Sequence, residues 1–167
     1  MPGLLAVRNG DSKMIKIERV LIPVDGSDSS RNAALYAAHL VNTRNPTLYL
    51  LHVWEPVNMT IGGEMAEKLR QSAHDKAMAT LEEYKKLLEP CGMKVELIAR
   101  SGRPDYVILN VQDELDCDLI VIGSRGLSVL ENVIMGSVVT RVLEGANCPV
   151  LVTRNLRLKY LEGACGI

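Results

Sequence analysis

The sequence predicts one doubly wound α/β domain, in which helices sandwich a five-stranded parallel sheet. Two observations carry this prediction. Five short runs rich in Val, Leu and Ile alternate with segments of helical periodicity, and each connection is long enough for a right-handed crossover between parallel strands. The 167 residues suffice to bury about two-thirds of the unfolded surface in one core. We expect a flexible leader over 1–16, one domain over 17–154 and a tail over 155–167.

The first elements are two strands with a helix between them. Residues 19–25 (RVLIPVD) form a β-branched apolar run, which is typical of a strand buried on both faces. The turn GSDSS follows and offers a helix N-cap at Ser27 or Asp28. The helix covers 29–43, and residues 47–54 (TLYLLHVW) predict the second strand.

A long helix follows over residues 64–89. Its apolar residues recur at three- and four-residue spacing and form one stripe: Met65, Leu69, Ala73, Ala77, Leu81, Tyr84 and Leu88. Residues 90–92 (PCG) end this helix. Residues 94–100 (KVELIAR) alternate between apolar and polar, which predicts a third strand near a sheet edge.

The last part of the chain repeats the same alternation. Pro104 suits the first turn of a helix, whose inward stripe comprises Val107, Val111 and Leu115. Three further elements are expected in order: a strand over 118–123, a helix over 137–146 and a strand over 148–154.

Composition excludes several classes of protein. Aromatic residues make up only 4% and Phe is absent, which argues against stacking on single-stranded nucleic acid. The net charge is −1 without a long basic run, so binding to DNA or to a membrane surface is not expected. No apolar run reaches the ~20 residues of a membrane helix, and the N-terminus lacks a secretory pattern. A cytoplasmic protein is therefore predicted.

The cysteines predict neither a metal site nor a redox pair. Cys91, Cys117, Cys148 and Cys165 form no CxxC motif, and the three histidines are scattered. We interpret the four cysteines as reduced, buried thiols.

The ends of two predicted strands carry unusual residues. Ligands of such sheets bind beyond the carboxyl ends of the strands, where the strand order reverses. One strand ends at Pro23, Val24 and Asp25, and another ends at Gly123 before the segment GSRGLSVLENVIMGS. If these two strands are neighbours, Asp25 faces this glycine loop.

The loop suits the binding of a bulky anion. Gly126 and Gly136 can adopt positive φ and let phosphate oxygens approach the backbone. The helix that begins at Ser137 offers unpaired amides, the positive end of its dipole and a hydroxyl group. Arg125 is the only cation of the loop, and Asp25 can accept ribose hydroxyls.

Each of these residues also has a purely structural interpretation. Asp25 and Ser27 fit a turn and a helix cap, and the glycines fit a turn. Ser137 fits an N-cap, and Arg125 fits a solvated loop cation. His52, inside an apolar strand, fits a satisfied core or interface residue. The hypothesis of a binding site depends on the combination of these residues at one crevice.

Several catalytic and nucleotide-binding motifs are missing from the sequence. There is no GxxxxGK[ST], no GxSxG and no GxGxxG. No carboxylate cluster is present to hold a metal, so any Mg²⁺ would depend mainly on phosphate oxygens. We find no pair of a base and a nucleophile, and an enzyme is therefore not expected.

The loop fits the pattern G-x2-G-x9-G-[ST], because it consists of GSRG, nine further residues and then GS. This pattern resembles that of the ATP-binding subclass of the universal stress protein family. RVLIPVDGSDSS, LYLLHVWEP, CDLIVIGSRG and NCPVLVTR resemble the family's strands as well, so the similarity covers about 17–154. The resemblance implies an adenine nucleotide alpha hydrolase-like fold with strand order 3-2-1-4-5.

The resemblance also implies a site for ATP, or for AMP or ADP, with Mg²⁺ held mainly by the phosphates. Pro23, Val24 and Asp25 match the segment along the adenosine, with Asp25 toward the ribose, and the backbone of Val53 matches the adenine contact. The residues that match the ribose and phosphate contacts are Gly123, Gly126, Gly136, Ser137 and Val138. Arg125 departs from the pattern, because many members carry His there.

The family further implies a homodimer joined through the last strand, 148–154, which is apolar and would otherwise be an unprotected edge. The function that follows is an ATP-binding, nucleotide-dependent regulatory or signalling module of the stress response. Two alternatives stay open: a slow ATPase at the same site, with at most weak hydrolysis, and a nucleotide-free dimeric scaffold.

Overall fold

Five parallel strands form one sheet in the computed structural model, which describes residues 16–41, 45–56, 63–126, 135–154 and 156. The order is β3-β2-β1-β4-β5, which confirms the predicted fold class. The strands are β1 (Arg19–Pro23), β2 (Thr47–Trp54), β3 (Lys94–Ser101), β4 (Leu119–Gly123) and β5 (Val150–Thr153). The strand order reverses between β1 and β4, and these two strands pair directly with each other.

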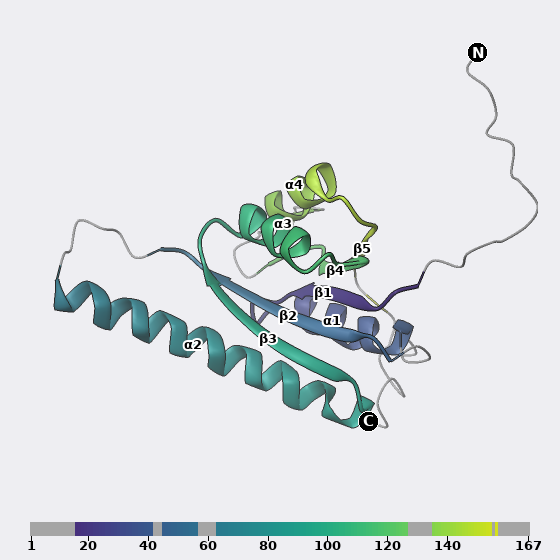
Figure 1. The fold of residues 1–167 in the computed structure, drawn as a ribbon, viewed down its shortest axis with the longest axis horizontal. Coiled ribbons are helices and arrows are strands. Elements are labelled where there is room, and N and C mark those ends of the chain that lie inside the picture. Colours follow the sequence, from purple (N-terminus) through teal and green to yellow (C-terminus); the bar gives the residue numbers. More distant parts are fainter. Residues whose placement is uncertain (1–15, 42–44, 57–62, 127–134, 155, 157–167) are drawn as a thin grey trace, which may run out of the picture.

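Helices cover both faces of this sheet (Figure 1). They are α1 (Asp28–Val41), α2 (Glu64–Leu88), α3 (Pro104–Glu114) and α4 (Ser137–Gly145), with a short 3₁₀ turn, η2 (Glu89–Cys91), after α2. α1 and α2 pack on one face around Val20, Ile22 and Leu50. α3 and α4 pack on the other around Leu21 and Ile120. Alternate residues of one strand therefore supply both cores.

The local sequence explains where several elements begin and end. α1 begins at Asp28, and the Ser27 hydroxyl accepts a hydrogen bond from the Ser30 amide at 3.2 Å, so Ser27 is the cap. Gly92, with φ of 64°, ends η2 in the left-handed region. β3 lies at a sheet edge, as its alternation predicted.

The apolar stripe predicted for α2 is buried only in the second half of the helix. Met65 and Leu69 are 59% and 40% exposed, whereas Leu81, Tyr84 and Leu88 are fully buried. The α2 helix is longer than the sheet that it covers, and its N-terminal end extends past the strands (Figure 1). Met65 and Leu69 therefore belong to the predicted apolar stripe but are not part of the core.

The cysteines also depart in part from expectation. Cys117 is buried and free, and burial raises its pKa to about 12. Cys148 is free and half-buried. Cys91 is disulfide-bonded, so the interpretation as a reduced thiol is wrong for this residue. Cys165 lies outside the described residues.

Two predictions fall largely outside the described part of the chain. Of the leader over 1–16 only Lys16 is described, and of the tail over 155–167 only Leu156. Among the described helices, none has the length and apolar character needed to cross a membrane.

Candidate functional site

A cavity of about 200 Å³ opens at the carboxyl edge of the sheet, beside the ends of β1, β2 and β4. We call it the main cavity. It is lined by every residue of the predicted site: Pro23, Val24, Asp25, Val53, Gly123, Arg125, Gly126, Gly136, Ser137 and Val138. Four segments that are far apart in sequence therefore meet in one place, because β1 and β4 are neighbours.

The three glycines of the loop serve three different contacts. A Cβ on Gly123 would lie 2.6 Å from Ser29 Oγ and 2.7 Å from two backbone atoms of Ser29. A Cβ on Gly126 would lie 2.6 Å from Asp25 Oδ2. Gly136 is the N-cap of α4, in extended conformation with φ of −72°. Gly123 and Gly126 therefore permit close approach of neighbouring groups.

Gly126 and Gly136 do not use the positive φ that glycine can adopt. The described glycines with positive φ are Gly26, Gly63, Gly92 and Gly102. The Gly136 amide donates to the Ser124 carbonyl at 3.0 Å, which fixes the start of α4 next to the end of β4. Where α4 begins relative to β4 is therefore set by a hydrogen bond between two segments and not by a left-handed glycine.

The first turn of α4 faces the main cavity. Gly136 occupies the N-cap position, so the interpretation of Ser137 as a plain N-cap is wrong. Ser137, Val138 and Val139 all line the cavity, and the amides at the start of a helix have no intrahelical acceptor. This wall therefore presents amide donors and the positive end of the α4 dipole.

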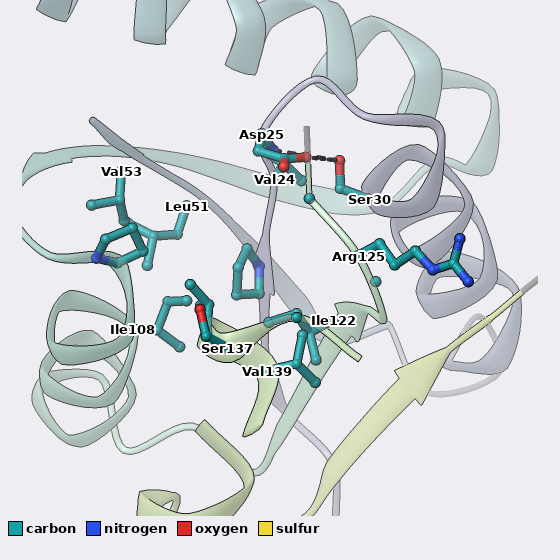
Figure 2. Close-up of a pocket in the computed structure, with 16 residues that line it drawn as sticks. Val24, Asp25, Ser30, Leu51, Val53, Ile108, Ile122, Arg125, Ser137 and Val139 are labelled. Atoms are coloured by element: carbon teal, nitrogen blue, oxygen red, sulfur yellow. Dashed lines mark hydrogen bonds between the residues drawn. The ribbon is translucent and has the colours of Figure 1, made fainter. Parts of the chain in front are cut away.

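A polar network holds Asp25 at the opposite wall. Asp25 Oδ1 accepts hydrogen bonds from the Ser27 amide at 3.0 Å, from Ser27 Oγ at 2.6 Å and from Ser30 Oγ at 2.8 Å. Figure 2 shows Asp25 and Ser30 side by side above Ser137 and Val139. The turn-and-cap interpretation of Asp25 and Ser27 is thus correct, and the same carboxylate also lines the cavity through its position beside Gly126.

The network continues into the core of the protein. Tyr84 of α2 is 1% exposed, and its Oη lies 2.6 Å from Ser30 Oγ. Burial raises the pKa of Tyr84, which keeps the phenol protonated and able to donate. A chain from Tyr84 through Ser30 to Asp25 therefore links α2 to the wall of the cavity.

His52 lies close behind this wall. Burial lowers the pKa of His52, while a hydrogen bond with the Val24 backbone and the charge of Asp25 oppose that shift. Its Nδ1 is buried and has no hydrogen-bond partner among the described residues. The interpretation as a satisfied core residue is therefore wrong for this atom, and the alternative of an interface residue stays a prediction.

Arg125 contributes to the cavity in a different way than expected. It lines the cavity, but Figure 2 shows its guanidinium directed away from Asp25 and Ser137, toward α1 and β5. Its Nε is buried without a partner among the described residues. In this structure the guanidinium does not add charge to the wall formed by α4.

Six lining residues were not predicted: Ser30, Leu51, Pro104, Ile108, Ile122 and Val139. The cavity has an apolar floor between the sheet and α3 (Figure 2). Its aliphatic side chains are those of Leu51, Val53, Ile108, Ile122 and Val139. Pro104 follows β3 at the same carboxyl edge, so its position after a strand end could have predicted that it lines the cavity. The sequence could not have predicted Ile108 as a lining residue, because its position beside the cavity depends on how α3 packs on the sheet.

The arrangement suits a ligand with an apolar, flat part and an anionic part. The floor is aliphatic, one wall offers a fixed carboxylate, and the other offers helix amides. No group of three or more His, Cys, Asp or Glu residues that could hold a metal ion occurs among the described residues.

Comparisons with known proteins agree with this architecture. The family model for the universal stress protein family matches residues 16–154. The universal stress protein MJ0531 of Methanocaldococcus jannaschii is 32% identical over 151 residues, which cover 89% of this chain and 86% of that protein.

Solved structures show the same fold. The structure of MJ0577, a protein of the same archaeon, has a TM-score of 0.78 and 27% identity, covering 86% of this chain and 99% of that one. A universal stress protein in complex with cAMP has a TM-score of 0.62 and 26% identity, covering 83% and 97%. The chain therefore belongs to the universal stress protein family.

Proposed function

We propose that the main cavity binds adenine nucleotides and that the protein is an ATP-binding regulatory or signalling module of the stress response. The observation that carries the proposal is the meeting of ten predicted residues from four segments in one cavity. The cAMP complex of a relative supports the same ligand class.

The first turn of α4 is the proposed phosphate site. Ser137, Val138 and Val139 line the cavity at the start of α4, and helix N-termini favour phosphate groups. Because the described residues contain no acidic cluster, Mg²⁺ would be held mainly by the phosphates of ATP.

Asp25 is the proposed partner of the ribose. Three hydrogen bonds to Oδ1 orient the carboxylate, and Oδ2 lies on the side of Gly126. The aliphatic side chains of Val53 and Ile108 suit the faces of an adenine ring.

Two measurements test the ligand. Acid extraction of the purified protein would reveal any bound nucleotide, and calorimetry would compare ATP, AMP and GTP. We expect ATP and AMP to bind more tightly than GTP. Equal affinities for ATP and GTP, or no binding of either, would contradict the proposal, and turnover measured with Mg²⁺ would detect slow ATP hydrolysis.

A matched pair of variants tests the site itself. Gly126→Ala places a Cβ 2.6 Å from Asp25 Oδ2, so the carboxylate must move. We expect the affinity for ATP to fall about tenfold, the equivalent of one charge-assisted hydrogen bond. The control is Gly145→Ala at the far end of α4, whose Cβ has the Leu109 side chain as its nearest neighbour. This variant should bind ATP normally.

We further propose a homodimer joined through β5, within the predicted segment 148–154. β5 is an edge strand, and its apolar residues Val150, Leu151 and Val152 are only half-buried, which supports pairing with a second edge. Light scattering tests this proposal, and a monomer at micromolar concentration would refute it. The cytoplasmic location stays a prediction that cell fractionation can check.

A further inference from the structure

A second, smaller cavity of about 110 Å³ lies beside the main cavity. We call it the flanking cavity. It is formed by the first turns of α1, the residues after β4 and the residues at the end of β5, and its polar lining includes Asp28, Ser29, Asn32, Arg125, Thr153 and Arg154. Its volume exceeds the ~30 Å³ that one water molecule takes in the liquid.

Two buried polar atoms in this lining lack partners. Thr153 is only 4% exposed, and its Oγ1 has no hydrogen-bond partner among the described residues. The same is true of Arg125 Nε. Because buried polar atoms are nearly always hydrogen-bonded, two such atoms in one cavity point to a group that binds there.

The charges of the lining indicate an anion. Neither Arg125 nor Arg154 has a carboxylate within 4.0 Å among the described ion pairs, and Asp28 is the single acidic residue of the lining. Figure 2 shows the Arg125 guanidinium directed to this side, toward α1 and β5. Two guanidinium groups against one carboxylate favour a negatively charged ligand and disfavour a metal cation.

The donors around the cavity fit a group with several acceptor oxygens. The amides of Asp28 and Ser29 open the 14-residue helix α1, where no intrahelical acceptor exists. Ser29, Asn32 and Thr153 add side-chain donors from two different elements. A phosphate group offers oxygens in several directions and matches this set.

We propose that the flanking cavity is a second anion site, which binds a phosphate group between Arg125, Arg154, Thr153 and the start of α1. The phosphate is either free or the terminal phosphate of a ligand in the main cavity, since Arg125 lines both cavities. Binding of free phosphate does not depend on the proposed function, whereas binding of a terminal phosphate rests on the proposed nucleotide binding in the main cavity.

Amide NMR of the full chain, titrated with inorganic phosphate at constant ionic strength, tests the proposal. We expect saturable shifts at Ser29, Asn32 and Thr153. A second titration with AMP and a third with ATP distinguish the source of the phosphate. If only ATP shifts these amides, the site takes the terminal phosphate of the nucleotide; if inorganic phosphate shifts them, it takes a free phosphate.

Two variants connect the shifts to the cavity. Arg125→Gln should weaken phosphate binding about tenfold, because it removes a charge-assisted hydrogen bond. Thr153→Val should weaken it several-fold without lowering the melting temperature, a combination that a purely structural role would not produce. Arg100→Gln is the matched control, since Arg100 lies on β3 at the opposite edge of the sheet.

The outcomes decide the proposal in both directions. Chloride in place of phosphate should leave the three amides unchanged. The proposal is overturned if neither phosphate nor ATP shifts them, if shifts are confined to Gly126, Ser137 and Val138, or if Arg125→Gln binds phosphate like the unaltered protein.

Discussion

The main cavity and the flanking cavity share Arg125, but their polar atoms are in opposite states. At the main cavity, Asp25 Oδ1 and Ser30 of the lining form a continuous hydrogen-bond network with Tyr84 of the core behind it. In the flanking cavity, Thr153 Oγ1 and Arg125 Nε have no partner among the described residues. A completed network fixes the shape of a wall, whereas unpaired buried atoms retain the capacity to bind a ligand.

The largest expected effect comes from Gly123→Ala, which disturbs the boundary between the two cavities. Its Cβ would approach the Ser29 backbone to 2.7 Å, and backbone cannot move aside as a side-chain end can. We expect the free energy of unfolding to fall by about 1–3 kcal/mol, measured by urea denaturation.

Gly145→Ala is the control for this variant, because the nearest atoms to its Cβ belong to the flexible side chain of Leu109. It should cost less stability than Gly123→Ala. Equal costs would mean that α1 and β4 are not closely packed at Gly123.

Tyr84→Phe tests the completed network of the main cavity. The variant removes the Oη that lies 2.6 Å from Ser30 Oγ and retains the ring. One lost buried hydrogen bond should lower the free energy of unfolding by about 1 kcal/mol, measured by thermal and chemical denaturation.

Tyr106→Phe serves as the matched control, since Tyr106 is 59% exposed. Its stability should stay within about 0.5 kcal/mol of the unaltered protein. If Tyr84→Phe behaves like this control, the network does not stabilise the fold.

Thr153→Val tests the unpaired atoms of the flanking cavity, and its expected effect on the free energy of unfolding is opposite to that of Tyr84→Phe. In phosphate-free buffer, replacing an unsatisfied buried hydroxyl by a methyl group of similar shape should leave stability unchanged or raise it by up to about 1 kcal/mol. A loss of stability, measured by calorimetric melting, would show that the hydroxyl has a partner after all.

The smallest effect concerns His52, whose pKa burial lowers below its usual value of 6.5. The unfolded chain then binds a proton more readily than the folded one. The stabilising contribution of neutral His52 is therefore fully present above pH 6.5 and is lost as the pH falls below it toward the folded pKa. We expect a fall in melting temperature between about pH 7 and pH 5.

His52→Leu should reduce this slope, because the substituted side chain does not titrate. Parallel melting curves for the two proteins would measure the difference. An identical pH dependence would assign the acid sensitivity to other groups.

The sequence predicted the elements well because local signals mark them. The apolar runs of β1 and β2, Ser27 as the cap of α1, and Pro104 at the start of α3 all lie where the pattern placed them. The first half of α2 was predicted less well, since periodicity shows which residues share a stripe but not how far the sheet extends beneath it.

The site divides in the same way. The sequence by itself determined that glycines, Asp25 and a helix start lie at strand ends, because their places along the chain relative to the apolar runs can be read directly. The neighbouring positions of β1 and β4 followed only from the family resemblance, and the structure confirms them. Only the tertiary structure decided that Gly136 bonds to Ser124, that Tyr84 reaches Ser30, and that Arg125 lines the flanking cavity. The physical reason is that each of these contacts joins segments distant in sequence, and their geometry follows from the packing of helices on the sheet, which local propensities do not encode.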